Sequence, residues 1–375
     1  MSRLIAVAIV FLVLLALQRK IYQNYWNKGL SVSVRFKTKE LFEGERGELQ
    51  EIIRNGKRLP LPMLKVKFQT SRNLVFEDTK GSRATDRYYR NDVFQAGAGE
   101  QITRTITFTG KKRGYYKIIG IDLVAADLFM TAEMTESLEA EDCYVYVYPK
   151  PYQSRELSLS LQQLNGEILT KRHLIEDPFE YRGIREYQPF DDMRSVNWKA
   201  TARTGELKVN QKNYTSIKTI RLFFNIEDTG ILKKEAAVEA ALQIVAGVAE
   251  SLLSTGIRVS VYGNGVDGIT GEKVEISPSA GQGQMERIYK ALARIDLEKE
   301  RLPFVKSFQE KVLQERGGTM TVFVSPNAYE DFLSLLEQLG TEGGEYVWFC
   351  PIWEKEEPAL PDTVRSHVRF LHIRE

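Results

Sequence analysis

An unbroken apolar run near the N-terminus, residues 4–17, limits most strongly what this chain can become. A hydrocarbon core of about 30 Å requires about 20 helical residues, so the run alone is short for a membrane span. The residues after it extend the span: two basic side chains can reach the headgroups, and apolar and aromatic side chains suit the interface, namely Arg19, Lys20, Ile21, Tyr22, Tyr25 and Trp26. We expect residues 1–27 to form a transmembrane anchor.

A cleaved signal peptide is the competing interpretation of the same run, because its length also suits that role. The run ends in Gln18, Arg19 and Lys20, without a small-x-small cleavage site, which favours an uncleaved anchor. Arg3 precedes the run, whereas Arg19, Lys20 and Lys28 follow it. By the positive-inside rule this small excess predicts a single-pass cell-membrane protein whose body is cytoplasmic.

The charge balance and the cysteines exclude several classes of protein. Lysine and arginine total 52 against 50 aspartate and glutamate residues, a net charge of +2. A general nucleic-acid binder needs a basic excess to displace counterions, so we expect no nucleic-acid partner. Cys143 and Cys350 are the two cysteines, which excludes a disulfide framework and fits a reducing compartment.

Residues 28–150 carry the pattern of short, half-buried strands. Alternation of apolar and polar side chains is clear over residues 31–36, 102–108 and 144–148. Glycine and asparagine turn signals separate such runs. We predict an antiparallel, immunoglobulin-like β-sandwich.

A polar connector, residues 151–213, is predicted to lead into an α/β domain over residues 214–375. There, apolar strands alternate with helices of 3.6-residue periodicity, which predicts a doubly wound parallel sheet with helices on both faces. The expected strands are residues 220–226, 258–262, 319–324 and 346–349, and the expected helices are residues 233–253, 284–295, 304–315 and 329–339. The chain as a whole is predicted to be a multidomain α+β protein.

A search for catalytic motifs yields no catalytic residues. The glycine-rich residues 263–268 follow a strand without opening a helix, which favours a loop bend over a phosphate cradle. The three histidines, His173, His367 and His372, are far apart, and we expect surface imidazoles there. We therefore predict that the chain is not an enzyme.

Residues 181–210 are unusual for their arginines, acids and single tryptophan. Asp191 and Asp192 stand where the N-cap and first turn of a short helix reaching Trp198 would begin. We expect Arg185, Arg194 and Arg203 to form bidentate pairs with these carboxylates, and Trp198 to be buried. Two interpretations remain, a salt-bridged clasp or a site for a partner or anion, formed by Arg185, Tyr187, Asp191, Asp192, Arg194, Trp198 and Arg203.

The same segment resembles the signature of a bacterial family, the domain-of-unknown-function 58 family, which runs roughly R-x-Y-x-x-G-D-x-x-R-x-I-x-W-x-x-x-A-R-x-x-x-L-x-V. The matching positions are Arg185, Tyr187, Asp191, Arg194, Val196, Trp198, Ala202, Arg203, Leu207 and Val209. Residues 113–116 and 127–129 resemble two further elements of that family. Phe190 and Met130 stand where the family usually has glycine.

The resemblance implies a von Willebrand factor A-like domain and a partner of the MoxR type, an AAA+ ATPase. It also implies a position where A domains bind Mg²⁺ through oxygen ligands. The degenerate candidates here are Asn225, Glu227 and Thr229, and residues 325–327 follow a later strand where the last acidic ligand would stand. An asparagine and a glutamate replace the family's first aspartate and serine, which argues against a metal, and we expect no cofactor.

Three functions follow as hypotheses. The first is a non-enzymatic, membrane-anchored adaptor or scaffold that partners the ATPase in envelope or complex assembly. The second is an outward-facing, metal-dependent adhesion module with a degenerate Mg²⁺ site. The third is a hydrolase that uses Asp191 or Asp192 with Arg203.

Overall fold

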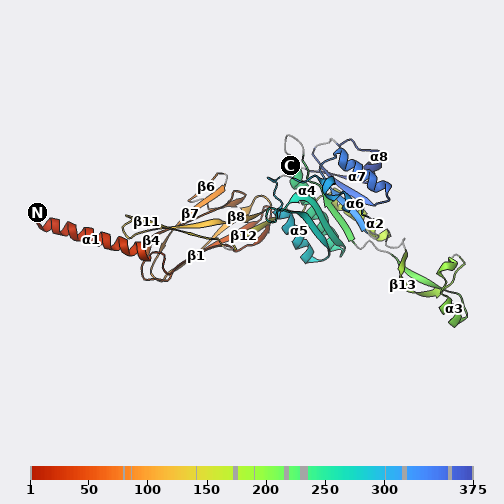
Figure 1. The fold of residues 1–375 in the computed structure, drawn as a ribbon, viewed down its shortest axis with the longest axis horizontal. Coiled ribbons are helices and arrows are strands. Elements are labelled where there is room, and N and C mark those ends of the chain that lie inside the picture. Colours follow the sequence, from red (N-terminus) through yellow and green to blue (C-terminus); the bar gives the residue numbers. More distant parts are fainter. Residues whose placement is uncertain are drawn as a thin grey trace. The chain divides into compact units, whose positions relative to one another are not determined.

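The computed structural model describes residues 2–78, 81–85, 87–140, 142–171, 176–189, 191–214, 219–228, 235–299, 301–314, 319–353 and 357–373. The protein is a mixed α+β chain with an apolar N-terminal helix and several separate sheets (Figure 1). It divides into two compact units, Met1–Lys150 and Pro151–Glu375, and each is described here by itself.

The first unit consists of one helix followed by β-strands. The helix is α1 (Ser2–Tyr25). The strands are β1 (Leu30–Phe36), β2 (Glu40–Phe42), β3 (Arg46–Asn55), β4 (Leu61–Ser71), β5 (Leu74–Phe76), β6 (Ser82–Ala84), β7 (Arg87–Ala96), β8 (Gln101–Gly110), β9 (Gly114–Lys117), β10 (Ile119–Ala126), β11 (Glu133–Leu138) and β12 (Tyr144–Tyr148).

Helix α1 is long and apolar enough to cross a bilayer. Within Arg3–Tyr25, an 18-residue window has a mean hydropathy of 2.3, and none of its residues is fully buried by the protein. The sequence predicted that the aromatic residues after the run lie at the membrane interface. Tyr22 and Trp26 instead are 3% and 5% exposed and belong to the hydrophobic core of the strands. They lie on the side of the chain that faces the β-sheets, whereas Tyr25 is exposed beneath the ammonium of Lys28.

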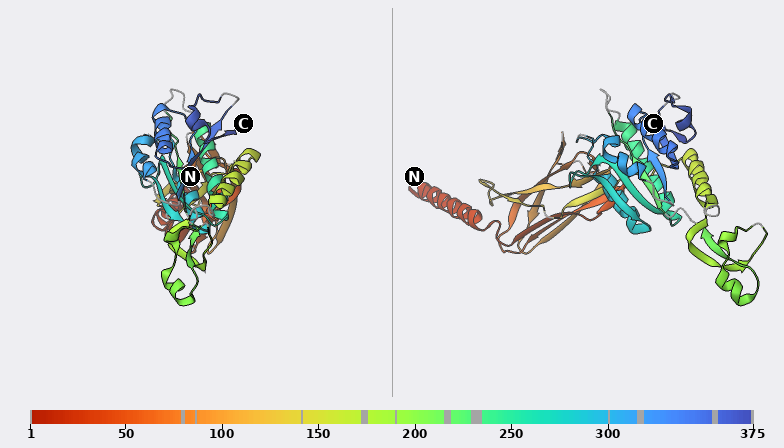
Figure 2. Two further views of the ribbon diagram at one scale, coloured as in Figure 1. Left: turned by 90° about the vertical axis from the view of Figure 1, so that its right-hand side faces the viewer. Right: turned by 45° about the vertical axis from the view of Figure 1, so that its right-hand side comes forward.

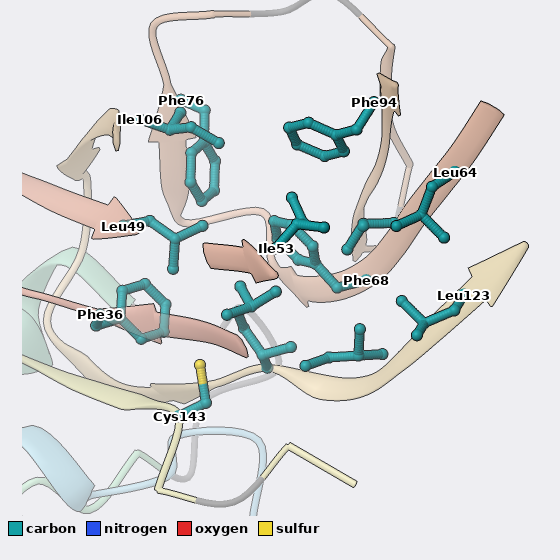
Figure 3. Close-up of a cluster of buried hydrophobic side chains, with 14 of the residues drawn as sticks. Phe36, Leu49, Ile53, Leu64, Phe68, Phe76, Phe94, Ile106, Leu123 and Cys143 are labelled. Carbon is teal, nitrogen blue, oxygen red and sulfur yellow. The ribbon is translucent and has the colours of Figure 1, made fainter. Parts of the chain in front are cut away.

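The strands form three sheets around one hydrophobic core. Their orders are β1-β3-β8-β5, β11-β10-β4-β7-β6 and β2-β12-β9, and neighbours are antiparallel except for β2 and β12, which are parallel. In the first sheet Phe36 pairs with Leu49, and Leu49 pairs with Ile106, so that three apolar side chains lie side by side (Figure 3). Burying each such side chain contributes about 1.5–3 kcal/mol.

The alternation that buries these apolar residues also buries charge. Glu51 on β3 and Arg90 and Asp92 on β7 occupy inward positions and are at most 3% exposed. The Arg90 guanidinium donates to the Asp92 carboxylate, and Arg104 donates to the same carboxylate at 2.7 Å. Glu51 accepts no hydrogen bond from any described residue. Burial, and next the nearby charge of Asp92, raise the pKa of Glu51 to about 8.

The raised pKa predicts that Glu51 weakens the first unit as the pH rises. Below about pH 4.5 the carboxyl is protonated in both folded and unfolded chains. Between about 4.5 and 8 only the unfolded chain ionises, so stability falls across that window. Glu51→Gln should remove this slope and raise stability at pH 7 by on the order of 2 kcal/mol.

Thermal unfolding of the detergent-solubilised chain between pH 5 and pH 8.5 measures this effect. The exposed Glu139→Gln is the matched control and should keep the wild-type slope. An unchanged slope in Glu51→Gln would contradict the assignment.

The second unit contains helices and strands in alternation. Its helices are α2 (Arg155–Lys171), the 3₁₀-helix η1 (Met193–Ser195), α3 (Trp198–Thr204), α4 (Glu235–Ser254), α5 (Gln282–Arg294), α6 (Phe304–Leu313), α7 (Glu330–Thr341) and α8 (Asp362–Arg365). Its strands are β13 (Glu176–Glu186), β14 (Lys208–Tyr214), β15 (Thr219–Phe224), β16 (Arg258–Val266), β17 (Lys273–Ser279), β18 (Thr319–Val324), β19 (Tyr346–Ile352) and β20 (Val368–His372).

Six of these strands form one sheet, in the order β17-β16-β15-β18-β19-β20. The sheet is parallel, as predicted, except at its edge, where β17 runs antiparallel to β16. Strand β17 was not expected, because Pro278 and only two large apolar side chains weaken its pattern. Phe223 and Phe323 pack with aromatic residues of α6 and α7. Helix α4 contacts the strands of the sheet, and the ribbon shows it on the other face from α6 and α7 (Figures 1 and 2). Helix α4 is apolar enough for a membrane span, but it is 67% buried and serves as a core helix.

The glycines of residues 263–268 lie in β16 and its end, not in the predicted loop bend. Gly263 pairs with Phe224 of β15, and a Cβ on Gly263 would lie 1.9 Å from Cζ of that ring. A Cβ on Gly265 would lie 2.8 Å from Cγ2 of Ile295. Both glycines therefore leave room for close packing of neighbouring side chains, a recurrent role of glycine in strands.

We predict that Gly263→Ala lowers the stability of the second unit by about 1–3 kcal/mol or more, because the new methyl group overlaps the Phe224 ring. Gly283→Ala is the matched control: it lies in α5 with open space around its Cβ, and should leave stability equal or higher. Thermal unfolding of both variants measures the difference. Equal midpoints would contradict the packing role.

Candidate functional site

The carboxyl ends of β15 and β16 are joined by two buried asparagines. Asn225 and Asn264 are at most 2% exposed. Asn264 Nδ2 donates to Asn225 Oδ1 at 3.0 Å, and the backbone N–H of Glu227 donates to the same oxygen at 2.9 Å. Asn264 Oδ1 accepts from the backbone N–H of Ile226 at 2.9 Å, and its Nδ2 also donates to the Leu302 carbonyl. The two amides thus satisfy the backbone at the end of both strands.

Further polar contacts extend this network to the neighbouring elements. The Glu227 carboxylate accepts from the backbone N–H of Phe304 at 3.1 Å, at the positive end of α6. Asp228 lies 3.5 Å from Arg301 in a nearly buried ion pair. The Asn327 side-chain amide donates to the Glu227 carbonyl. Sequence reasoning missed Asn264, although an asparagine at the carboxyl end of the strand next to Asn225 was a signal for it.

These residues do not fit a Mg²⁺ site. An amide oxygen has two lone pairs, and both acceptor positions of Asn225 Oδ1 already receive hydrogen bonds. One carboxylate oxygen of Glu227 accepts from the backbone N–H of Phe304, the first residue of α6. Across the described ranges, no group of three His, Cys, Asp or Glu side chains is placed to hold a metal. The third candidate, Thr229, lies outside the described residues.

We predict that Asn264→Ala lowers stability by about 2–4 kcal/mol, because it leaves the Ile226 N–H and the Leu302 carbonyl without their partner. In the wild-type chain, replacing EDTA with millimolar Mg²⁺ should leave the thermal midpoint unchanged. Calorimetry measures both effects. A rise in the midpoint with Mg²⁺ would contradict the structural role of the asparagines.

The family-like signature forms a second candidate site, which we call the hairpin subdomain and define as β13, η1, α3 and β14. Its two strands are antiparallel, with Arg185 opposite Val209 and Glu186 opposite Lys208. Arg185 donates to both carboxylate oxygens of Asp191, at 2.6 and 2.5 Å, which confirms one predicted bidentate pair. That pair holds the pKa of Asp191 below its usual range.

The second acid begins a helical turn, as predicted. The Asp192 side chain accepts from the backbone N–H of Arg194 at 2.9 Å and is the N-cap of η1. A separate cap, Asn197, accepts from the backbone N–H of Ala200 and begins α3. The predicted single helix reaching Trp198 is therefore two short helices. Phe190, the departure from the family glycine, lies outside the described residues.

The prediction that Trp198 is buried is wrong. Its side chain is 62% exposed at the first position of α3. The reason is geometric: no residue of α3 is buried, and the small core beneath it is filled by Val196 and Val209. Ile184, Met193 and Leu207 of this segment are also 40–54% exposed. The hairpin subdomain thus presents several large apolar side chains to solvent.

Over residues 183–210 of the hairpin subdomain, the acidic side chains are engaged, whereas three of the basic ones are not. Lys208 lies 3.3 Å from both Glu186 and Glu206. The predicted carboxylate pairs of Arg194 and Arg203 do not form: within the described part of the chain neither guanidinium takes part in a salt bridge, and the same holds for Lys199. The side chains of these three basic residues are exposed. Tyr187 contributes its backbone N–H to the Leu207 carbonyl.

Other reactive side chains do not gather into a site within the described ranges. Burial raises the pKa of the Cys143 thiol to about 11 and that of Cys350 to about 12. His367 stacks on Tyr346, His372 lies 3.5 Å from Glu156, and His173 lies outside the described residues.

A cleft of about 550 Å³ lies beside β17 and α5. Its charges are largely paired with one another: Arg294 lies 2.9 Å from Asp267, and Lys273 lies 3.0 Å from Glu275. This arrangement offers salt bridges rather than an activated nucleophile.

Comparison with known proteins supports a family for the chain. Residues 183–368 match the model of the family described as "Protein of unknown function DUF58". No curated protein matches the chain.

Similar solved structures include the CARDB domain of a Pyrococcus furiosus protein, with 17% identity over 32% of this chain and 94% of that one, at a TM-score of 0.20. They also include the sporulation control protein Spo0M of Bacillus subtilis, with 12% identity, 43% and 58% coverage and a TM-score of 0.19. A non-cellulosomal cohesin of Archaeoglobus fulgidus shows 13% identity, 31% and 84% coverage and a TM-score of 0.18. At these scores the likenesses carry no further argument.

Proposed function

We propose that this chain, whose match over residues 183–368 supports the DUF58 family, is a non-enzymatic, membrane-anchored adaptor. Helix α1 would hold it in the cell membrane with a cytoplasmic body. The first unit would be an immunoglobulin-like β-sandwich, and the six-stranded sheet with its helices a doubly wound, von Willebrand factor A-like domain. Its partner would be a MoxR-type AAA+ ATPase acting in envelope or complex assembly.

The exposed hairpin subdomain is the observation that carries this proposal. Trp198 is 62% exposed on a short helix, so its side chain gains the free energy of apolar burial only if a partner covers it. Tryptophan and arginine are also the side chains that most often dominate binding energy at protein interfaces. Over residues 183–210, Asp191, Glu186 and Glu206 are already paired and Asp192 caps η1, so the charged side chains left for a partner there are mainly the basic ones. We infer that Trp198, Arg194, Lys199 and Arg203 meet an acidic surface of the ATPase.

The adhesion hypothesis receives less support. It needs Mg²⁺, and among the described candidate ligands Asn225 Oδ1 is engaged in the Asn225–Asn264 network and Glu227 Oε2 accepts from the first N–H of α6. The hydrolase hypothesis pairs an acid with Arg203, whereas Asp191 is bound by Arg185 and Asp192 caps η1. The adaptor function needs neither chemistry.

Affinity capture from native membranes tests the adaptor function. With the detergent-solubilised full chain as bait, an AAA+ ATPase should co-purify, and the W198A/R203A double variant should reduce its recovery about tenfold or more. Tyr89→Ala combined with Arg87→Ala is the control, because it removes an exposed aromatic and an exposed basic side chain from β7 instead.

The outcomes separate the alternatives. If a correctly folded bait recovers no AAA+ ATPase, the adaptor proposal fails. If the ATPase is recovered equally by the double variant, the ATPase is a partner but the hairpin subdomain is not its docking surface.

A further inference from the structure

The junction between α1 and the β-strands is rigidly built. Gln18 Nε2 donates to Asp127 Oδ2 at 2.6 Å, and the Tyr22 hydroxyl donates to the Pro60 carbonyl at 2.8 Å. Leu15 and Gln18 are half-buried and Tyr22 is buried, whereas their neighbours on the helix are exposed. Spacings of three and four residues place these side chains on one face of the helix. That face of α1 is therefore the one that packs on the first unit.

Asp127 joins this helix face to the turn between β10 and β11. It is fully buried and accepts from the backbone N–H and the hydroxyl of Thr131 and from the backbone N–H of Ala132. The Met130 N–H donates to the Asp127 carbonyl at 3.0 Å and closes the turn. The turn is thus folded around the same carboxylate that receives Gln18.

Three consecutive residues of this turn are apolar and exposed. Leu128, Phe129 and Met130 are 49%, 54% and 61% exposed. Met130 also has a φ of 56°, a left-handed conformation that residues with a side chain rarely adopt. Three consecutive exposed apolar side chains, one of them in a strained conformation, indicate a surface that meets an apolar environment.

The position of the turn along α1 identifies that environment. Gln18 directly follows the apolar run of residues 4–17, so it stands where a membrane-spanning helix leaves the hydrocarbon. Leu15, about 4.5 Å further into the run at 1.5 Å per residue, is still half-buried by the protein. The surface beside Gln18 consequently lies at the boundary between acyl chains and headgroups.

We propose that Leu128, Phe129 and Met130 enter the lipid interface beside α1 and form a second membrane contact, which rests on the membrane anchoring proposed above. The helix supplies attachment and the turn fixes the side of the β-unit that faces the bilayer. Phenylalanine, leucine and methionine suit this boundary because their whole side chains are apolar and the Asp127 carboxylate behind them is satisfied within the protein.

A fluorescent thiol label, attached in the full chain reconstituted in phosphatidylcholine vesicles, tests the contact. Phe129→Cys places the label on the turn, Ala8→Cys places it in the apolar run, and Arg72→Cys places it at the opposite end of β4. The 11 residues of β4 separate Arg72 from the α1 end by about 33 Å. Cys143 and Cys350 are buried with raised pKa values, and labelling of the unmodified chain controls for them.

The expected result is quenching of the Phe129 label by nitroxides attached to lipid, with the strongest effect from nitroxides near the headgroup and a blue shift of its emission. The Arg72 label should show neither. Leu128→Cys and Met130→Cys should behave like Phe129→Cys, and because all three side chains are exposed, these changes leave the core intact.

Each other outcome overturns the proposal in a distinct way. If the Ala8 label is quenched and the Phe129 label remains in water, the anchor stands and the turn does not touch lipid. If the Phe129 label is shielded from water but not reached by lipid nitroxides, a protein surface covers the turn instead. If the Ala8 label is not quenched, the membrane anchoring itself fails, and the contact with it.

Discussion

Burial of Tyr22 and Trp26 in the core of the first unit makes the apolar helix and the β-strands one packed body. A membrane helix joined by a free linker would leave the orientation of the following domain open. Here two aromatic side chains, the Tyr22–Pro60 hydrogen bond and the Gln18–Asp127 hydrogen bond fix the helix to the sheets. Any force or positional constraint that acts on the helix is therefore transmitted to the β-unit, which suits an anchored scaffold.

In the second unit, the polar residues at the carboxyl ends of β15 and β16 stabilise the fold. At the carboxyl ends of parallel strands, where related architectures place ligands, Asn225 and Asn264 bind backbone groups and each other. Glu227 binds the first N–H of α6 rather than projecting an open carboxylate. Asn225 has no charge to offer a metal ion, and its amide serves hydrogen bonding instead. These residues consequently stabilise the sheet, whereas the exposed basic and aromatic side chains lie in the hairpin subdomain.

Much of this fold follows from local patterns, and the exceptions depend on neighbours in space. Residues 144–148 and 319–324 become β12 and β18 with those bounds, because alternation or a continuous apolar run is a local property. Gly263 was interpreted as a bend signal, but it lies in a strand, where the absence of a side chain makes room for the ring of Phe224 on the adjacent strand. The Arg185–Asp191 pair followed from charge and spacing, whereas the exposure of Trp198 depended on the size of the core beneath it.

The polarity of the hairpin subdomain is the basis of the proposed docking role. Over residues 183–210, the acids bind Arg185, cap η1 or pair with Lys208, and none of them neutralises Arg194 or Arg203. What is left is a tryptophan beside bases on short helices that bury nothing of their own. Stability alone would favour polar or small residues at such positions, since an exposed indole gains no burial energy. Under the proposed adaptor function, the partner protein supplies both the apolar surface that covers Trp198 and the negative charge that meets the bases.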